Sequence, residues 1–162
     1  MARPRVFLET HSLESVIRQH VFFDGLEDRY IRFVTSCAKN ACFDANEQIF
    51  REGEPANNFY FIREGLVSVE LTIPQRGPRT VQTVRDGDVL GWSWLTPPFR
   101  WRFDARAVQR THALVFDGKC LRAKCEEDHD LGYEILKRFT NVVTERLDAT
   151  RLQLLDLYAT HV

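Results

Sequence analysis

Short apolar runs separated by turn-forming residues fill the middle of the sequence, and this feature most constrains the fold. Glycine, proline, asparagine or aspartate marks the turns, at residues 44–46, 52–55, 64–65, 76–78 and 86–88. Regularly spaced short strands joined by such turns are typical of an antiparallel barrel or jelly roll. The sequence therefore predicts a mainly β fold, an antiparallel jelly-roll barrel over residues 41–116, with helices at its two ends.

Individual strands can be placed within this region. In residues 67–73 apolar and polar side chains alternate, which directs Ser68 and Glu70 away from the apolar side. Residues 58–62 (NFYFI) are apolar on both faces and predict a central strand. Residues 103–107 alternate again, with alanines on the inner side.

The two ends of the chain follow helical patterns. Residues 12–20 and 27–38 predict two short helices, the first with a serine cap. After residue 118 the period becomes 3.6, which predicts a helix over residues 119–127 and a long one over 131–158, roughly 40 Å in length at about 1.5 Å per residue. The long helix either packs back on the barrel or forms a two-fold coiled coil. We expect a homodimer through a heptad-like seam of Leu136, Phe139, Val143, Leu147, Thr150, Leu154 and Leu157.

Charge and composition exclude several classes of protein. The 22 basic and 23 acidic side chains nearly cancel, giving a formal net charge of -1, so a general nucleic-acid binder with a strongly basic face is disfavoured and no direct DNA binding is expected. No apolar segment approaches the length of a membrane span or resembles a signal peptide, so we expect a cytoplasmic protein without membrane contact. A length of 162 residues predicts one domain.

Four cysteines raise a metal or redox alternative. Cys37 and Cys42, like Cys120 and Cys125, are five residues apart, whereas zinc sites usually have two to four intervening residues. We expect buried reduced thiols and no metal site, and retain a redox role as the alternative. Since no Ser/His/Asp order, carboxylate pair or phosphate-binding loop of the Walker type occurs, no enzymatic activity is expected.

Residues 86–107 have the most unusual composition in the chain. This stretch holds all three tryptophans, the pair Pro97-Pro98, and the arginines Arg100, Arg102 and Arg106. Adjacent prolines exclude a central strand, and so many large aromatics are unusual for a surface loop. The stretch predicts the wall of a pocket.

The chain resembles the cyclic nucleotide-binding domain of Crp/Fnr-type sensors. The resemblance covers residues 13–158 and rests on residues 22–26 (FFDGL), 43–53 (FDANEQIFREG), 59–69 (FYFIREGLVSV) and 86–91 (DGDVLG). It implies a single domain over residues 1–162, with N-terminal helices in 12–38, the barrel in 41–116, and C-terminal helices in 119–158. In the transcription factors of this family a helix-turn-helix domain follows the long helix, and we expect none here because the sequence ends at Val162.

The resemblance also implies a ligand site. Gly91 would begin a phosphate-binding cassette, in which a one-turn helix presents N–H groups to the phosphate. Trp92 stands where the family has a glutamate for the ribose, and Trp101 stands where it has the phosphate-binding arginine. The candidate ligand-binding residues are Gly91, Trp92, Ser93, Trp94, Leu95, Arg100, Trp101 and Arg102.

Three functions follow from these expectations. The first is a regulatory sensor that binds a cyclic nucleotide or, in preference, a different small anionic ligand in the barrel, and transmits the signal through the long helix. The second is a degenerate domain whose tryptophans fill the pocket and which acts as a dimeric scaffold for an unknown protein partner. The third, less favoured, is a haem or redox sensor.

Overall fold

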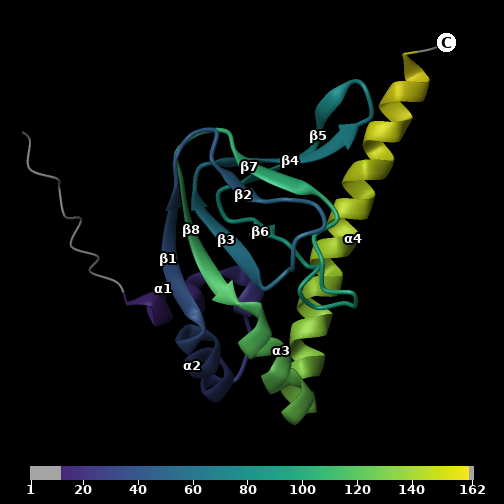
Figure 1. Ribbon diagram of the computed structural model, residues 1–162. Coiled ribbons are helices and arrows are strands. Elements are labelled where there is room, and N and C mark those ends of the chain that lie inside the picture. The colour runs from purple at the N-terminus through teal and green to yellow at the C-terminus, as the bar shows by residue number, and fades with distance from the viewer. Residues whose placement is uncertain (1–11, 161–162) are drawn as a thin grey trace, which may run out of the picture.

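Two four-stranded antiparallel sheets form the centre of the molecule (Figure 1). The computed structural model describes residues 12–160. One sheet has the order β1-β8-β3-β6 and the other the order β2-β7-β4-β5. The strands are β1 Ala38–Phe43, β2 Gln48–Phe50, β3 Asn58–Glu64, β4 Leu66–Ile73, β5 Gly77–Arg85, β6 Val89–Leu90, β7 Asp104–Ala107 and β8 Thr111–Asp117. The predicted antiparallel jelly-roll fold is confirmed, and β3 is central as expected because it pairs with both β8 and β6.

Alternation in β4 was a poor guide to burial. Ser68 and Glu70, expected on the side opposite to the apolar residues, are nonetheless buried, at 5% and 8% exposed. Ser68 forms a hydrogen bond of 2.8 Å with the Thr80 hydroxyl, and Glu70 lies 3.5 Å from the Arg106 guanidinium. Polar partners on the neighbouring strands β5 and β7 therefore allow both faces of this part of β4 to be buried.

Four α-helices and a short 3₁₀ helix flank the sheets. They are α1 Leu13–Gln19, the 3₁₀ helix η1 Val21–Phe23, α2 Asp28–Ser36, α3 Gly118–Glu127 and α4 His129–Ala159. Ser12 caps α1 as predicted, and the carboxylates of Asp117 and Asp128 cap α3 and α4 by accepting backbone N–H groups. In the described part of the chain, no helix is long and apolar enough to cross a membrane.

An aromatic cluster between the sheets and the helices forms the core. Phe59 stacks on Phe116, with ring centroids 4.6 Å apart, and both rings are fully buried. Phe139 of α4 meets the edge of this cluster, 5.2 Å from the Phe59 centroid. Phe139 is 2% exposed, so its place in the expected dimer seam is wrong: it belongs to the core of this chain.

The long helix α4 divides into two parts. Its first part packs on the core through Leu131, Ile135 and Phe139, and all residues from 147 to 159 are exposed. Figure 1 shows this second part continuing past the sheets, beside the β4–β5 hairpin. This part therefore lacks the tertiary packing that normally stabilises a helix in a protein, and a short helix without such packing is marginal in water.

Candidate functional site

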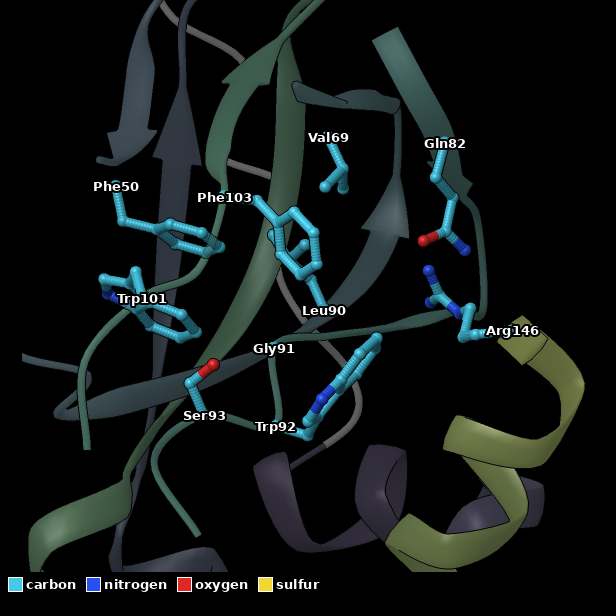
Figure 2. A pocket seen from close by; sticks show the side chains of 10 residues that line it. All are labelled: Phe50, Val69, Gln82, Leu90, Gly91, Trp92, Ser93, Trp101, Phe103 and Arg146. Atoms are coloured by element: carbon cyan, nitrogen blue, oxygen red, sulfur yellow. The ribbon is translucent and has the colours of Figure 1, made fainter. Parts of the chain in front are cut away.

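Trp101 fills the interior of the barrel beside β6. Its indole stacks on Phe50 of β2, with centroids 3.7 Å apart and an interplanar angle of 7° (Figure 2). Trp101 is 5% exposed and Phe50 is 6% exposed, so both rings are nearly removed from water. By the resemblance described above, Trp101 stands at the sequence position of the phosphate-binding arginine.

Gly91 makes room for this indole. An added Cβ at Gly91 would lie 2.7 Å from both Cη2 and Cζ3 of Trp101, closer than van der Waals contact allows. The φ angle of Gly91 is +92°, which side-chain-bearing residues rarely adopt. The resemblance implies that Gly91 begins a phosphate-binding cassette. In this structure the missing side chain of Gly91 also leaves the space that the Trp101 indole occupies.

The space left inside the barrel is very small. It has a volume of about 20 Å³, and this holds about one water molecule. Pockets for small-molecule ligands measure about 300–1,000 Å³. Its walls are Phe50, Val69, Gln82, Leu90, Gly91, Trp92, Ser93, Trp101, Phe103 and Arg146. The barrel interior of this structure has no room for a nucleotide.

A larger groove opens next to this cavity, between the β4–β5 hairpin and α4. It has a volume of about 540 Å³ and mainly apolar walls, formed by Val69, Leu71, Thr80, Val81, Gln82, Trp92, Phe103, Val143, Arg146, Leu147, Thr150 and Gln153. Trp92 and Arg146 line both spaces. The volume is that of a ligand site, and the walls suit a flat apolar body.

Arg146 is the cation of this groove. Its Nη2 donates a hydrogen bond of 2.6 Å to the Val89 carbonyl, and its guanidinium lies 6.0 Å from the centroid of the Trp92 ring. Figure 2 shows its side chain extending from α4 toward Gln82 and Trp92. Burial lowers the pKa of Arg146 from its ordinary value, although an arginine stays charged at neutral pH.

Comparison with known proteins assigns the family. The model of the cyclic nucleotide-binding domain matches residues 41–128, more than half of the sequence. The chain belongs to the cyclic nucleotide-binding domain family. It is 30% identical over 156 residues to cyclic nucleotide-gated ion channel 18 of Arabidopsis thaliana, covering 95% of this chain and 21% of the channel. This chain thus spans about a fifth of the length of that relative.

Solved structures support the same fold. A cyclic nucleotide-binding protein assigned in Geobacter metallireducens superimposes with a TM-score of 0.77 at 25% identity, over 85% of this chain and 99% of that one. The sensor domain of the transcriptional regulator DNR of Pseudomonas aeruginosa has a TM-score of 0.67 at 18% identity, over 83% and 91% of the two chains. The second likeness concerns the fold alone.

The cassette of this cyclic nucleotide-binding domain has no helix. Residues 91–100 contain turns and bends and, at Arg100, an isolated bridge to Pro55. The turns are closed by the hydrogen bonds from Leu95 N–H to Trp92 O and from Phe99 N–H to Thr96 O. The one-turn helix implied by the resemblance is therefore not formed. Without it, the backbone offers no helix N-terminus to a phosphate.

The predicted site residues separate into three groups. Gly91, Trp92, Ser93 and Trp101 line the small cavity. Leu95 packs beside the core, and Trp94 lies wholly inside it.

Arg100 and Arg102 form the third group and line neither the small cavity nor the groove. Both are exposed, and Arg100 donates to the Gly53 carbonyl at 2.7 Å. The cation that does reach the site, Arg146, comes from α4. A signal for it exists in the sequence: it follows Phe139 by seven residues, so it falls on the core-facing side of the helix.

Trp94 connects the cassette to the C-terminal helices. Its ring stacks on Phe59 at 4.8 Å and meets Phe139 of α4 at 5.3 Å. Its carbonyl accepts a hydrogen bond from Arg122 of α3. A displacement of residues 91–95 would therefore press on both α3 and α4.

The described residues include no group of three or more metal-ligating side chains that could hold a metal ion. The groove walls contain no histidine, cysteine, methionine or tyrosine. Such walls provide no usual axial ligand for a haem iron.

Proposed function

We propose that this cyclic nucleotide-binding domain is a non-enzymatic regulatory module whose ligand is a small, flat anion bound in the groove between β4–β5 and α4. The ligand's ring lies against Trp92, its anionic group pairs with Arg146, and the signal leaves through α4. The observation that carries the proposal is the position of Arg146, a half-buried cation on apolar walls, next to a barrel interior that Trp101 occupies.

The charge on Arg146 supports an anionic ligand. In the described part of the chain, its hydrogen bond is to the neutral carbonyl of Val89, and it forms no ion pair with a carboxylate. Asp88 and Glu145 act on its pKa only as more distant charges. A carboxylate or phosphate on a ligand would supply the charge-assisted hydrogen bond that the protein does not.

The contacts of α4 support transmission. Arg146 connects α4 to the first residue of β6 through its hydrogen bond to the Val89 carbonyl. Phe139 connects α4 to the cassette through its ring contact with Trp94. A ligand that drew the guanidinium away from Val89 would free the second part of α4 from the barrel. The helix would then change its angle or its partner.

Thermal shift and calorimetry test the ligand. Indole-3-carboxylate, salicylate, cyclic AMP and cyclic GMP are the probes, and we expect the flat carboxylates to raise Tm and the cyclic nucleotides to leave it unchanged. The Arg146→Gln variant should lose the carboxylate affinity by 10- to 100-fold, since a charge-assisted hydrogen bond contributes about 1.5–3 kcal/mol. Arg102→Gln, an exposed cation outside the groove, is the matched control and should bind as the parent does.

Two outcomes would contradict the proposal. Equal binding by the parent and Arg146→Gln would remove Arg146 from the site, and tight cyclic AMP binding would return the ligand to the barrel. If no probe bound at all, the second candidate, a scaffold without a ligand, would take precedence. That candidate is favoured by the filled barrel interior, in which Trp101 and Phe50 stack face to face.

We propose further that the chain forms a homodimer through α4. Leu136, Val143, Leu147, Leu154 and Leu157 are 38–61% exposed, and their spacings of three, four and seven residues form one stripe. Val143 and Leu147 of this stripe also belong to the groove walls. An exposed apolar stripe of this kind supports an interface with a second copy. The described residues of α4 span 31 positions, enough for four heptads.

Light scattering tests the dimer. The double variant Leu147→Glu/Leu154→Glu should be monomeric, because it places four carboxylates in the seam of a dimer. Leu152→Glu is the control, since Leu152 is 63% exposed but lies on the opposite side of the helix. A parent protein that is monomeric at all concentrations would refute the dimer.

We place the module in the cytoplasm. The four cysteines are free thiols, which suits a reducing compartment. The expectation that they are buried is wrong for Cys42 and Cys120, which are exposed.

A further inference from the structure

Two cysteines far apart in the sequence meet at the junction of α2, β1 and α3. Cys37 follows α2, and Cys120 lies in the first turn of α3, 83 residues later. Their Sγ atoms are 3.5 Å apart, and the Cys37 thiol donates to the Cys120 sulfur. The pair was not apparent from the sequence, where the spacings of five drew attention to the wrong partners.

The backbone holds this pair in place. The Asp117 N–H donates to the Cys37 carbonyl at 2.9 Å, and the neighbouring Ala38 is paired with Phe116 in the β1–β8 ladder. Asp117 also caps α3 through the Cys120 N–H. The two sulfurs must approach by about 1.5 Å to reach the S–S length of about 2.05 Å.

We propose that Cys37 and Cys120 form a dithiol modification site, which a low-molecular-weight disulfide such as glutathione disulfide oxidises to an intramolecular disulfide. This site is independent of the groove and of its ligand. The exposed Cys120 thiolate attacks one sulfur of glutathione disulfide, which gives a mixed disulfide and releases one glutathione thiolate. Cys37 then gives its proton to the released glutathione thiolate and attacks the Cys120 sulfur, and the second glutathione leaves as a thiolate and takes up the proton that Cys120 had lost to solvent. Two protein thiols are oxidised, and one glutathione disulfide is reduced to two glutathiones.

The environments of the two thiols fix this order of events. Cys120 is exposed, while Cys37 is half-buried. Burial, and then the adjacent Cys120, raise the pKa of Cys37 to about 12, so Cys37 remains protonated at neutral pH. The exposed thiol therefore meets the oxidant first, and the buried thiol completes the bond from its position 3.5 Å away.

The disulfide would fasten the start of α3 to the end of α2. The opposite ends of these two helices are already linked. The hydroxyl of Tyr30, near the start of α2, donates to the carboxylate of Asp128, between α3 and α4, at 2.9 Å. A covalent bond across an 83-residue separation restricts the unfolded chain strongly. Oxidation would thus hold α3, and with it the base of α4, against the N-terminal helices.

Mass spectrometry of the whole chain tests the site. Reduced protein is incubated with excess glutathione disulfide at pH 8, alkylated in denaturant and digested. We expect the parent to lose the mass of two hydrogen atoms, to retain two alkylatable cysteines, and to yield a linked peptide pair containing Cys37 and Cys120. Cys42→Ser, which removes an exposed thiol outside the pair, should give the same mass loss and the same linked peptide pair, with one alkylatable cysteine left instead of two.

Single variants of the pair give the complementary result. Cys37→Ser should retain a glutathione on Cys120, because the resolving thiol is gone, and Cys120→Ser should form no disulfide with Cys37. The oxidised parent should melt at least about 5 °C above the reduced parent. Four alkylatable cysteines after oxidation, a linked pair other than Cys37–Cys120, or a lower Tm on oxidation would each overturn the proposal.

Discussion

Replacing Trp101 by alanine tests whether this indole fills the place of a ligand. The change removes a ring that is 5% exposed and stacked on Phe50 at 3.7 Å. Core Trp→Ala substitutions cost about 3–5 kcal/mol, and the loss of a stacked aromatic pair contributes about 0.5–1.5 kcal/mol beyond the buried area. We expect Trp101→Ala to destabilise the protein by about 4 kcal/mol, at the middle of the core range.

Trp92→Ala is the matched control. Trp92 lies in the same loop but is only half-buried at the mouth of the groove, with its ring 6.5 Å from Phe103. Partial burial and a looser aromatic contact predict a cost of about 1–2 kcal/mol. For a chain of this size, about 1 kcal/mol corresponds to 2–4 °C in Tm, so the two variants should differ clearly.

Urea unfolding followed by circular dichroism measures both costs, and indole provides a rescue. The space opened by Trp101→Ala is walled by Phe50, Val69 and Leu90, and apolar cavities of this kind stay dry and bind aromatic molecules. At ten times its Kd, indole should restore about 1.4 kcal/mol to Trp101→Ala and leave Trp92→Ala unchanged. Equal costs for the two variants, or equal rescue of both, would refute the conclusion that Trp101 fills the barrel.

Two further substitutions test features of the same region and of the helix junction. Gly91→Ala should destabilise the protein more than Gly53→Ala. Both glycines have positive φ, so an alanine at either position costs about 1–2 kcal/mol of folding stability. Only at Gly91 does the new Cβ meet Trp101, which adds about 1–3 kcal/mol of overpacking. Similar urea midpoints for the two would contradict the contact. The hydrogen bond from the Leu131 N–H holds the pKa of Asp128 below its ordinary 3.8, so its stabilising contribution is present above that value and is lost as the pH falls through the lower pKa of the folded state. Asp128→Asn keeps an acceptor without titrating, and its Tm should fall less than that of the parent between pH 5 and pH 2.

Much of the fold could be predicted because its determinants are local. Turn residues and short apolar runs locate most strands, and periodicity locates α3 and α4 to within two residues. Burial in β4 could not be predicted this way, since the partners of Ser68 and Glu70 lie on other strands. Phe139 was misassigned for a related reason: a spacing of three and four residues is the same whether a helix faces its own core or a second helix.

The candidate site was predictable only in part. Gly91, Trp92, Ser93 and Trp101 were identified by the resemblance and by their unusual composition, and they line one cavity. Arg146 was not, because it lies 45 residues from Trp101 and reaches the site only when α4 packs along the barrel. Proximity in the sequence favoured Arg100 and Arg102 instead, which lie outside the groove.

The contacts of α4 also determine where the helix can move. Phe139 is fixed in the aromatic core between Phe22, Phe59 and Trp94, so moving it would open the core. Arg146, seven residues on, is held to the described part of the barrel by its hydrogen bond to the Val89 carbonyl, and such a bond contributes about 1.5–3 kcal/mol when one partner is charged. Coupling free energies of about 1–3 kcal/mol are typical of regulated transitions. The hydrogen bond between Arg146 and Val89 is in this range, so a ligand could break it, whereas moving Phe139 would cost the packing of the core.

Hydrogen exchange of the Arg146→Gln variant measures this division. Removing the hydrogen bond to Val89 should speed amide exchange in residues 147–159, which are exposed in the single chain, and leave residues 131–139 as protected as in the parent. Arg102→Gln, exposed and away from α4 in the sequence, should change neither segment. Faster exchange along the whole of α4 would mean that the helix moves as one rigid body, and the hinge would then lie at the α3–α4 junction near Asp128 instead of between Phe139 and Arg146.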